Sequence, residues 1–189
     1  MAPLPALRST VPGSTLIYTI FQNAGKNYNT GLELTLDQKV SASYRFNVNG
    51  NIYHNQINAF SVLNLYPQQN VFSAALQEIA SWNLKANNFF KFGGKYEAQL
   101  TVIYLAPDII PQGKIAERFS LDVSVKRQIQ KGKGELFFNA TDLLNTLVVK
   151  RSILGQDFNY VSTDYHETQM VRFGYPISFN RISFFDLFQ

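Results

Sequence analysis

The run from Val40 to Tyr53 alternates apolar and polar side chains almost without interruption. One set of alternate positions is apolar apart from a single glycine: Val40, Ala42, Tyr44, Phe46, Val48, Gly50 and Ile52. The intervening set is polar: Ser41, Ser43, Arg45, Asn47, Asn49 and Asn51. Because successive side chains of a strand point to opposite faces, whereas a helix would spread them around its axis, this run predicts a β-strand with one apolar and one polar face.

The length of this run is its second informative property. Fourteen extended residues span about 45 Å, whereas strands of globular proteins are usually about five or six residues long. A tilted strand needs about 9–11 residues to cross the hydrocarbon core of a bilayer. The run is therefore long enough to cross a membrane and to project beyond it.

The same alternation recurs along the chain and predicts about eight strands. They cover residues 14–22, 27–37, 39–53, 75–91, 94–106, 114–128, 134–152 and 166–179. Tight turns at 37–39, 92–94 and 130–134 alternate with longer loops at 54–74, 107–113 and 155–165, although the connection at 23–26 is short where a long one is expected. Outer-membrane barrels have short periplasmic turns and longer extracellular loops. We therefore predict an all-β fold, an antiparallel meander of about eight long strands that is part of a transmembrane β-barrel.

Composition separates a membrane barrel from a soluble β-sandwich or barrel, which also alternates. Charged residues are only 16% of the chain, below the roughly 25% of soluble domains. Aromatic residues fall near the ends of the apolar strand faces: Tyr44, Trp82, Phe90, Tyr96, Tyr104 and Phe179. Such positions are typical of the aromatic girdles at membrane interfaces. Strand length and girdle together favour the membrane barrel.

Several function classes are excluded or disfavoured by what the chain contains. It has no cysteine, and its lysines and arginines are scattered rather than gathered into a nucleic-acid footprint. No apolar run is long enough for a transmembrane helix, and the first residues do not form a signal peptide. Since an outer-membrane protein needs a signal peptide, we expect the chain to be a fragment of a longer precursor.

The sequence offers no catalytic, cofactor or metal site. His54 and His166 lie at loop edges without nearby ligands, and Gly93 with Gly94 fits a hairpin turn better than a phosphate-binding loop. Asp142 and Asn145 lack calcium-loop spacing and predict a bulge or turn in the penultimate strand. The carboxylates on the polar faces are expected to pair with basic neighbours rather than to catalyse: Glu33, Glu97, Asp122 and Glu135 with Arg45, Lys85, Lys126 and Arg172. We therefore expect no enzyme and no cofactor.

Four segments together resemble a known family. They are residues 23–34 (NAGKNYNTGLEL), 112–127, with GK followed by FSLDVSVKR, 138–146 (FNATDLLNT) and 171–179 (VRFGYPISF). In order and spacing they resemble strand entries, a penultimate strand and a closing strand of TonB-dependent outer-membrane receptors. The closest variety is the outer membrane protein β-barrel family common in Bacteroidota.

The resemblance implies a domain organisation, a location and a role. Residues 14–179 would be a partial outer-membrane barrel, preceded by an irregular segment at 1–13. They would be followed by an atypical tail at 180–189, because barrels of this family usually end on the closing aromatic, here Phe179. The parent would import siderophore-iron, cobalamin or an oligosaccharide across the bacterial outer membrane. Its partners would be outer-membrane lipid, the nutrient, and TonB through a plug region absent from this chain.

The loop at 54–74 is the best sequence candidate for contact with a nutrient, through Phe60, Leu65 and Tyr66. An ordinary extracellular loop is the alternative. Two other functions also stay open. One is a small stand-alone outer-membrane barrel with a structural or adhesion role, and the other is a soluble lipocalin-like β-barrel binding module.

Overall fold

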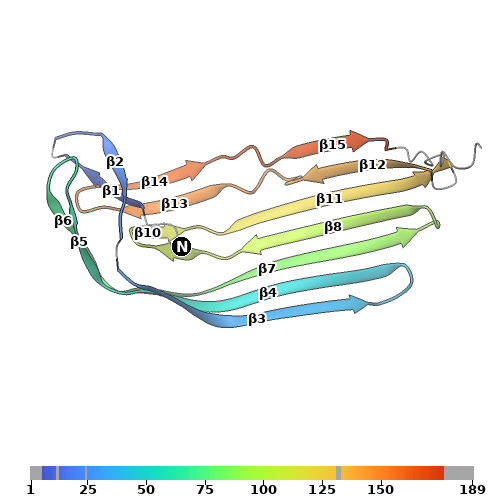
Figure 1. Cartoon of the computed structure of the whole chain (residues 1–189), viewed down its shortest axis with the longest axis horizontal. Coiled ribbons are helices and arrows are strands. Elements are labelled where there is room, and N and C mark those ends of the chain that lie inside the picture. Colours follow the sequence, from blue (N-terminus) through green and yellow to red (C-terminus); the bar gives the residue numbers. More distant parts are fainter. Residues whose placement is uncertain (1–5, 12, 24, 131–132, 177–189) are drawn as a thin grey trace, which may run out of the picture.

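Seven antiparallel strands form the main sheet of the computed structural model, which describes residues 6–11, 13–23, 25–130 and 133–176 (Figure 1). We call this sheet the wall. Its strands are β3 (Asn27–Lys39), β4 (Tyr44–Ile57), β7 (Gln77–Phe92), β8 (Tyr96–Leu105), β11 (Arg118–Ile129), β12 (Gly134–Thr141) and β15 (Met170–Gly174). Their order in the sheet follows the chain. The all-β antiparallel meander is thus confirmed, with seven strands in the wall.

The other eight strands, each of three to six residues, lie toward the end of the wall where the long connections lie (Figure 1). They form the hairpin of β1 (Ala6–Thr10) with β2 (Ile17–Phe21) and the hairpin of β5 (Phe60–Asn64) with β6 (Asn70–Ala74). A four-stranded sheet contains β9 (Asp108–Ile110), β10 (Gly113–Ile115), β13 (Val149–Leu154) and β14 (Asn159–Asp164). The segments expected to be loops therefore have a strand structure of their own.

Several predicted boundaries were wrong. The strand expected over 134–152 is broken between Thr141 and Val149, and the loop expected over 54–74 is largely the β5–β6 hairpin. The segment at 14–22 does not join the wall, because β2 pairs with β1, which itself lies in the stretch expected to be irregular. The short connection at 23–26 therefore does not link two wall strands, and this explains why it broke the alternation of short and long connections.

The tight turns lie together at the opposite end of the wall (Figure 1). The turn predicted at 92–94 is present at 93–95, and a turn follows Ile129 as expected, although residues 131 and 132 lie outside the described part. The first turn is at 40–43 rather than 37–39, since β3 continues to Lys39. The amides of Val40 and Ser41 both donate to the carbonyl of Tyr44, each at 3.1 Å, and close this turn.

One face of the wall is apolar across its strands, because the cross-strand register aligns the alternating residues. A single row joins Leu36, Val48, Ala86, Val102 and Leu121. Large side chains on this face are exposed, for example Ile52 at 63% and Phe173 at 76%. A face of this kind is stable only against an apolar surrounding such as lipid.

Aromatic pairs mark both ends of this apolar face. Near the turns, Tyr44 stacks on Phe90 with ring centroids 5.0 Å apart. Near the other end, the rings of Trp82 and Tyr104 lie 4.7 Å apart. On β7 the stretch from Trp82 to Phe90 matches the about 9–11 residues of a membrane crossing. The predicted girdle is present at these positions, whereas Phe179 lies outside the described residues.

The wall does not close on itself. β3 and β15 are its first and last strands, and within the described residues each pairs with a wall neighbour on one side only. A small core stabilises the end with the short strands and contains Leu7, Ile57, Phe60, Phe72 and Ile109. No helix of the described residues is long and apolar enough to cross a membrane.

Candidate functional site

The polar face of the wall, opposite the apolar face, is the candidate functional surface. In its middle, amide and hydroxyl side chains hydrogen-bond along and across the strands, next to the charged Glu33 and Lys85, which lie opposite Asn51 and Asn49. Thr35 Oγ1 donates to Asn49 Oδ1 at 2.9 Å, and Asn49 Nδ2 donates to Asn47 Oδ1 at 2.7 Å. Asn51 Nδ2 donates to Asn83 Oδ1 at 2.9 Å. This amide ladder presents donors and acceptors without net charge to whatever occupies the space beside it.

A row of alternating charges crosses four strands close to the turns. The register aligns Lys91, Glu97 and Lys126 on β7, β8 and β11, and Glu135 on β12 lies diagonally from Lys126, opposite Gln128. The ammonium of Lys126 lies 3.1 Å from Glu97 and 3.5 Å from Glu135, and that of Lys91 lies 3.2 Å from Glu97. We call these four residues the charge row. Each carboxylate has a lysine beside it, so the row fixes polar side chains in place without leaving a free acid.

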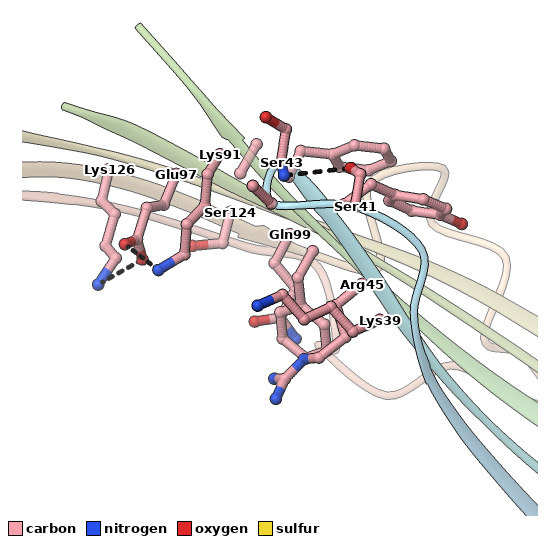
Figure 2. A pocket seen from close by; sticks show the side chains of 14 residues that line it. Lys39, Ser41, Ser43, Arg45, Lys91, Glu97, Gln99, Ser124 and Lys126 are labelled. Atoms are coloured by element: carbon pink, nitrogen blue, oxygen red, sulfur yellow. Dashed lines mark hydrogen bonds and ion pairs between the residues drawn. The ribbon is translucent and has the colours of Figure 1, made fainter. Parts of the chain in front are cut away.

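A hollow of about 560 Å³ lies between the charge row and the β3–β4 turn (Figure 2). Lys39 and Arg45 are cross-strand partners on its other side, away from the ion pairs. The guanidinium of Arg45 lies 4.5 Å from the centre of the Phe89 ring, a cation–π contact rather than an ion pair. The hollow is therefore positively charged on this side and balanced on the other.

A second polar cluster closes the polar face near the short strands. Asp108 on β9 accepts hydrogen bonds from the Tyr53 hydroxyl at 3.0 Å and from Asn55 Nδ2 at 2.8 Å. Ser81 Oγ donates to the carbonyl of Pro107 at 2.7 Å. Asn55 and Ser81 are almost fully buried. These contacts hold the β8–β9 connection against the ends of β4 and β7 that lie near the short strands.

The break after β12 is organised by one buried carboxylate. The oxygens of Asp142 accept hydrogen bonds from the amides of Thr146 and Leu147, at 3.0 and 3.2 Å, and from the Thr168 hydroxyl at 2.7 Å. The amide of Asp142 donates to Asp122 Oδ1 at 2.8 Å. Asp142 adopts φ 45°, which turns the chain out of the strand. The turn predicted here is confirmed, and its role is structural.

The predicted ion pairing on the polar face is confirmed only in part. Glu97 and Glu135 pair with Lys126, whereas in the described residues neither Glu33 nor Asp122 has a basic partner within 4.0 Å. His54 lies 3.6 Å from Glu78, and both side chains are about half exposed. The described part of the chain holds no group of three metal-binding side chains.

The three residues predicted to contact a nutrient are separated by the structure. Phe60 is 9% exposed and belongs to the small core, where its ring lies 5.9 Å from that of Phe72. Leu65 and Tyr66 are 73% and 60% exposed in the connection between β5 and β6. The Tyr66 ring packs edge-on against Tyr18 at 5.4 Å. Only Leu65 and Tyr66 are therefore placed to meet a molecule from outside.

The sequence alone did not predict the charge row or the Asp108 cluster. Alternation identifies which residues share a face of one strand, but not which residue of the next strand lies opposite. The position of each hairpin turn would have supplied the register of the charge row, because the turn fixes which residues of the two strands lie opposite each other.

A wall of long antiparallel strands, with an exposed apolar face bounded by aromatic pairs and a hydrogen-bonded polar face, defines a β-barrel protein of the outer membrane. The chain belongs to the outer membrane protein beta-barrel family, whose model matches residues 7–180. Its location is accordingly the bacterial outer membrane, with lipid against the apolar face. Neither a curated protein nor a solved structure matches the chain.

Proposed function

We propose that this chain forms the C-terminal part of the wall of a TonB-dependent receptor that imports a nutrient such as siderophore-iron, cobalamin or an oligosaccharide. The observation that carries the proposal is the open wall. Every backbone donor and acceptor within lipid must be paired, so β3 and β15 each need a further strand. Additional strands give a wider barrel, and wide barrels enclose a lumen rather than a core of side chains.

The polar face supports a lumen that is occupied during transport. The hollow beside the charge row remains open, and the amide ladder above it offers neutral hydrogen-bonding groups. In the proposed receptor the plug region would lie against this face and couple to TonB, and the nutrient would pass along it. The proposed role is transport and not catalysis, and it requires neither a cofactor nor nucleic acid.

Uptake by living cells tests this proposal. The probes are ferric siderophore, cyanocobalamin and a radiolabelled maltooligosaccharide. The strains are the wild type, one lacking the gene for this protein, one lacking TonB and one lacking both. We expect both deletions to lower the uptake of the same probe, and the double deletion to add nothing. Unchanged uptake of all three probes, or uptake that persists without TonB, would contradict the proposal.

A small stand-alone barrel requires β3 to pair with β15. That closure would give seven strands, whereas bacterial single-chain barrels have an even number. The chain has no cysteine, so the two edges can be tested with Leu34→Cys and Val171→Cys. We expect no disulfide between these edges in the membrane, while Leu34→Cys with Gly50→Cys, which are cross-strand partners, cross-links readily. Efficient cross-linking of the edges would support the small barrel instead.

A further inference from the structure

Arg127 is the only lysine or arginine on the apolar face of the seven wall strands. The register places it opposite Tyr96 on one side and Leu136 on the other. Its guanidinium lies 5.0 Å from the centre of the Tyr96 ring, and that ring stacks on Phe92 at 5.4 Å. The cation is therefore held within the aromatic girdle near the turns, at the height where lipid headgroups meet the hydrocarbon.

No carboxylate of the described residues neutralises this cation. None lies within 4.0 Å of Arg127, and the nearest acidic residues along the strands, Glu97 and Glu135, pair with Lys126 on the opposite face. A charged side chain facing lipid is costly unless its head reaches the interface and meets an anion there. The planar guanidinium with its fixed donors suits the oxygens of a phosphate.

Two further cations lie in the turns next to the end of β11 that carries Arg127. Lys95 ends the β7–β8 turn, where its carbonyl accepts a hydrogen bond from the amide of Gln128 at 2.9 Å. Lys133 ends the β11–β12 turn, where its amide donates to the carbonyl of Gln130 at 3.2 Å. Both lysine side chains are exposed. The end of the wall with the turns thus carries Arg127 and these two lysines.

We propose that Arg127, with Lys95 and Lys133, binds the phosphate of an anionic phospholipid in the leaflet that faces the turns. The apolar residues beside Arg127 would contact the acyl chains, since Phe138 and Phe92 are 41% and 50% exposed on the same face. This apolar surround favours a lipid over free phosphate. The inference rests on the membrane placement of the wall and not on the proposed transport.

Lipid retention measures this site directly. The full-length protein is purified from the outer membrane in mild detergent and exchanged into micelles containing phosphatidylglycerol and phosphatidylcholine at equal mole fractions. Native mass spectrometry then counts the lipids bound to the wild type, to Arg127→Gln and to the triple variant with Lys95→Gln and Lys133→Gln. The matched control is Lys114→Gln with Lys150→Gln, which removes two exposed cations from the end with the short strands.

The wild type is expected to retain phosphatidylglycerol over phosphatidylcholine, and inorganic phosphate is expected not to displace it. Each cation removed should lower this preference by about fivefold, whereas the control should keep it. A variant that keeps its folded band on an unheated detergent gel is still folded. Equal retention of the two lipids by the wild type, an equal loss in the control, or displacement by inorganic phosphate would overturn the proposal. An unfolded triple variant leaves the decision to Arg127→Lys, which should keep most of the preference that Arg127→Gln loses.

Discussion

The hydroxyl of Tyr44 donates a hydrogen bond to Asn88 Oδ1 at 2.8 Å on the apolar face of the wall. Asn88 interrupts an otherwise apolar series on β7, with Leu100 and Phe46 as its cross-strand partners. An amide that faces lipid without a partner is unfavourable, because nothing in the hydrocarbon accepts or donates a hydrogen bond. Tyr44 therefore makes Asn88 acceptable at this position.

Removing the Tyr44 hydroxyl should show how far Asn88 depends on this hydrogen bond. We expect Tyr44→Phe to lower the free energy of unfolding by about 1–3 kcal/mol, because it leaves the Asn88 carbonyl without its donor. In the background of Asn88→Leu the same change should cost far less. Urea unfolding of the protein in phospholipid vesicles measures both values. Tyr104→Phe is the control on the same face, and a loss as large in the control as in Tyr44→Phe would count against the account.

The carboxylate of Asp142 should be the least replaceable group of the β12–β13 break. Asp142→Ala removes three hydrogen bonds to a buried acceptor, so we expect a loss of roughly 3 kcal/mol in the free energy of unfolding. Asp142→Asn keeps the shape but points a donor at another donor, so part of this loss should remain. Asp157→Asn, at an exposed site, should change little. An unfolding curve for Asp142→Ala that overlays the wild type would show that the break holds without this group.

Gly31 lies on β3 at a place where β4 leaves no room for a side chain. A Cβ atom at Gly31 would come within 2.4 Å of the Ile52 carbonyl oxygen and 2.6 Å of the Tyr53 Cβ. We expect Gly31→Ala to destabilise the protein by roughly 1–3 kcal/mol through this clash with the backbone. Gly50→Ala is the matched control, because the nearest atoms to its Cβ lie at 3.7 and 3.8 Å. Equal stability of the two variants in urea unfolding would refute the close approach.

The orientation of the wall predicts which turns a reagent reaches from outside the cell. A membrane-impermeant maleimide should label Gln68→Cys, in the β5–β6 connection, on intact cells. Lys95→Cys, in a tight turn, should be labelled only after the outer membrane is permeabilised. Both positions are exposed, so access to the thiol depends on the side of the membrane. Labelling of Lys95→Cys alone on intact cells would mean that the wall is inverted.

The strands of the wall could be predicted because alternation of side chains is a local property of the sequence. Alternation in Val40–Tyr53 follows from the two-residue period of a strand, and the structure keeps the apolar and polar faces that it indicates. The tight turn at Gly93 and Gly94 was equally readable, since both glycines have positive φ, at 56° and 65°. Such features depend only on residues that are close together in the sequence, so they can be read from it.

The remaining errors come from contacts between distant segments. Residues 17–21 alternate like a wall strand, yet they pair with β1, and nothing within them marks that choice. β12 ends at Thr141, and the amide of the next residue, Asp142, donates to Asp122, twenty residues away in sequence. Phe60 was expected at a ligand surface, but it packs on Phe72. Residues in a hairpin of this length can equally line a core. Such outcomes depend on tertiary partners rather than on local pattern.

The central claim is that lipid contacts the apolar face and an aqueous lumen contacts the polar face. Leu84 and Lys85 are adjacent on β7 and point to opposite faces, as their partners Gly50 and Asn49 show. An NBD fluorophore attached through Leu84→Cys or Lys85→Cys, in a cysteine-free protein reconstituted in bilayers, reports each environment. We expect lipids brominated along their chains to quench the probe at Leu84 and aqueous iodide to quench the probe at Lys85. The opposite pattern, as in a soluble barrel with an apolar interior, or equal quenching at both positions would contradict the account.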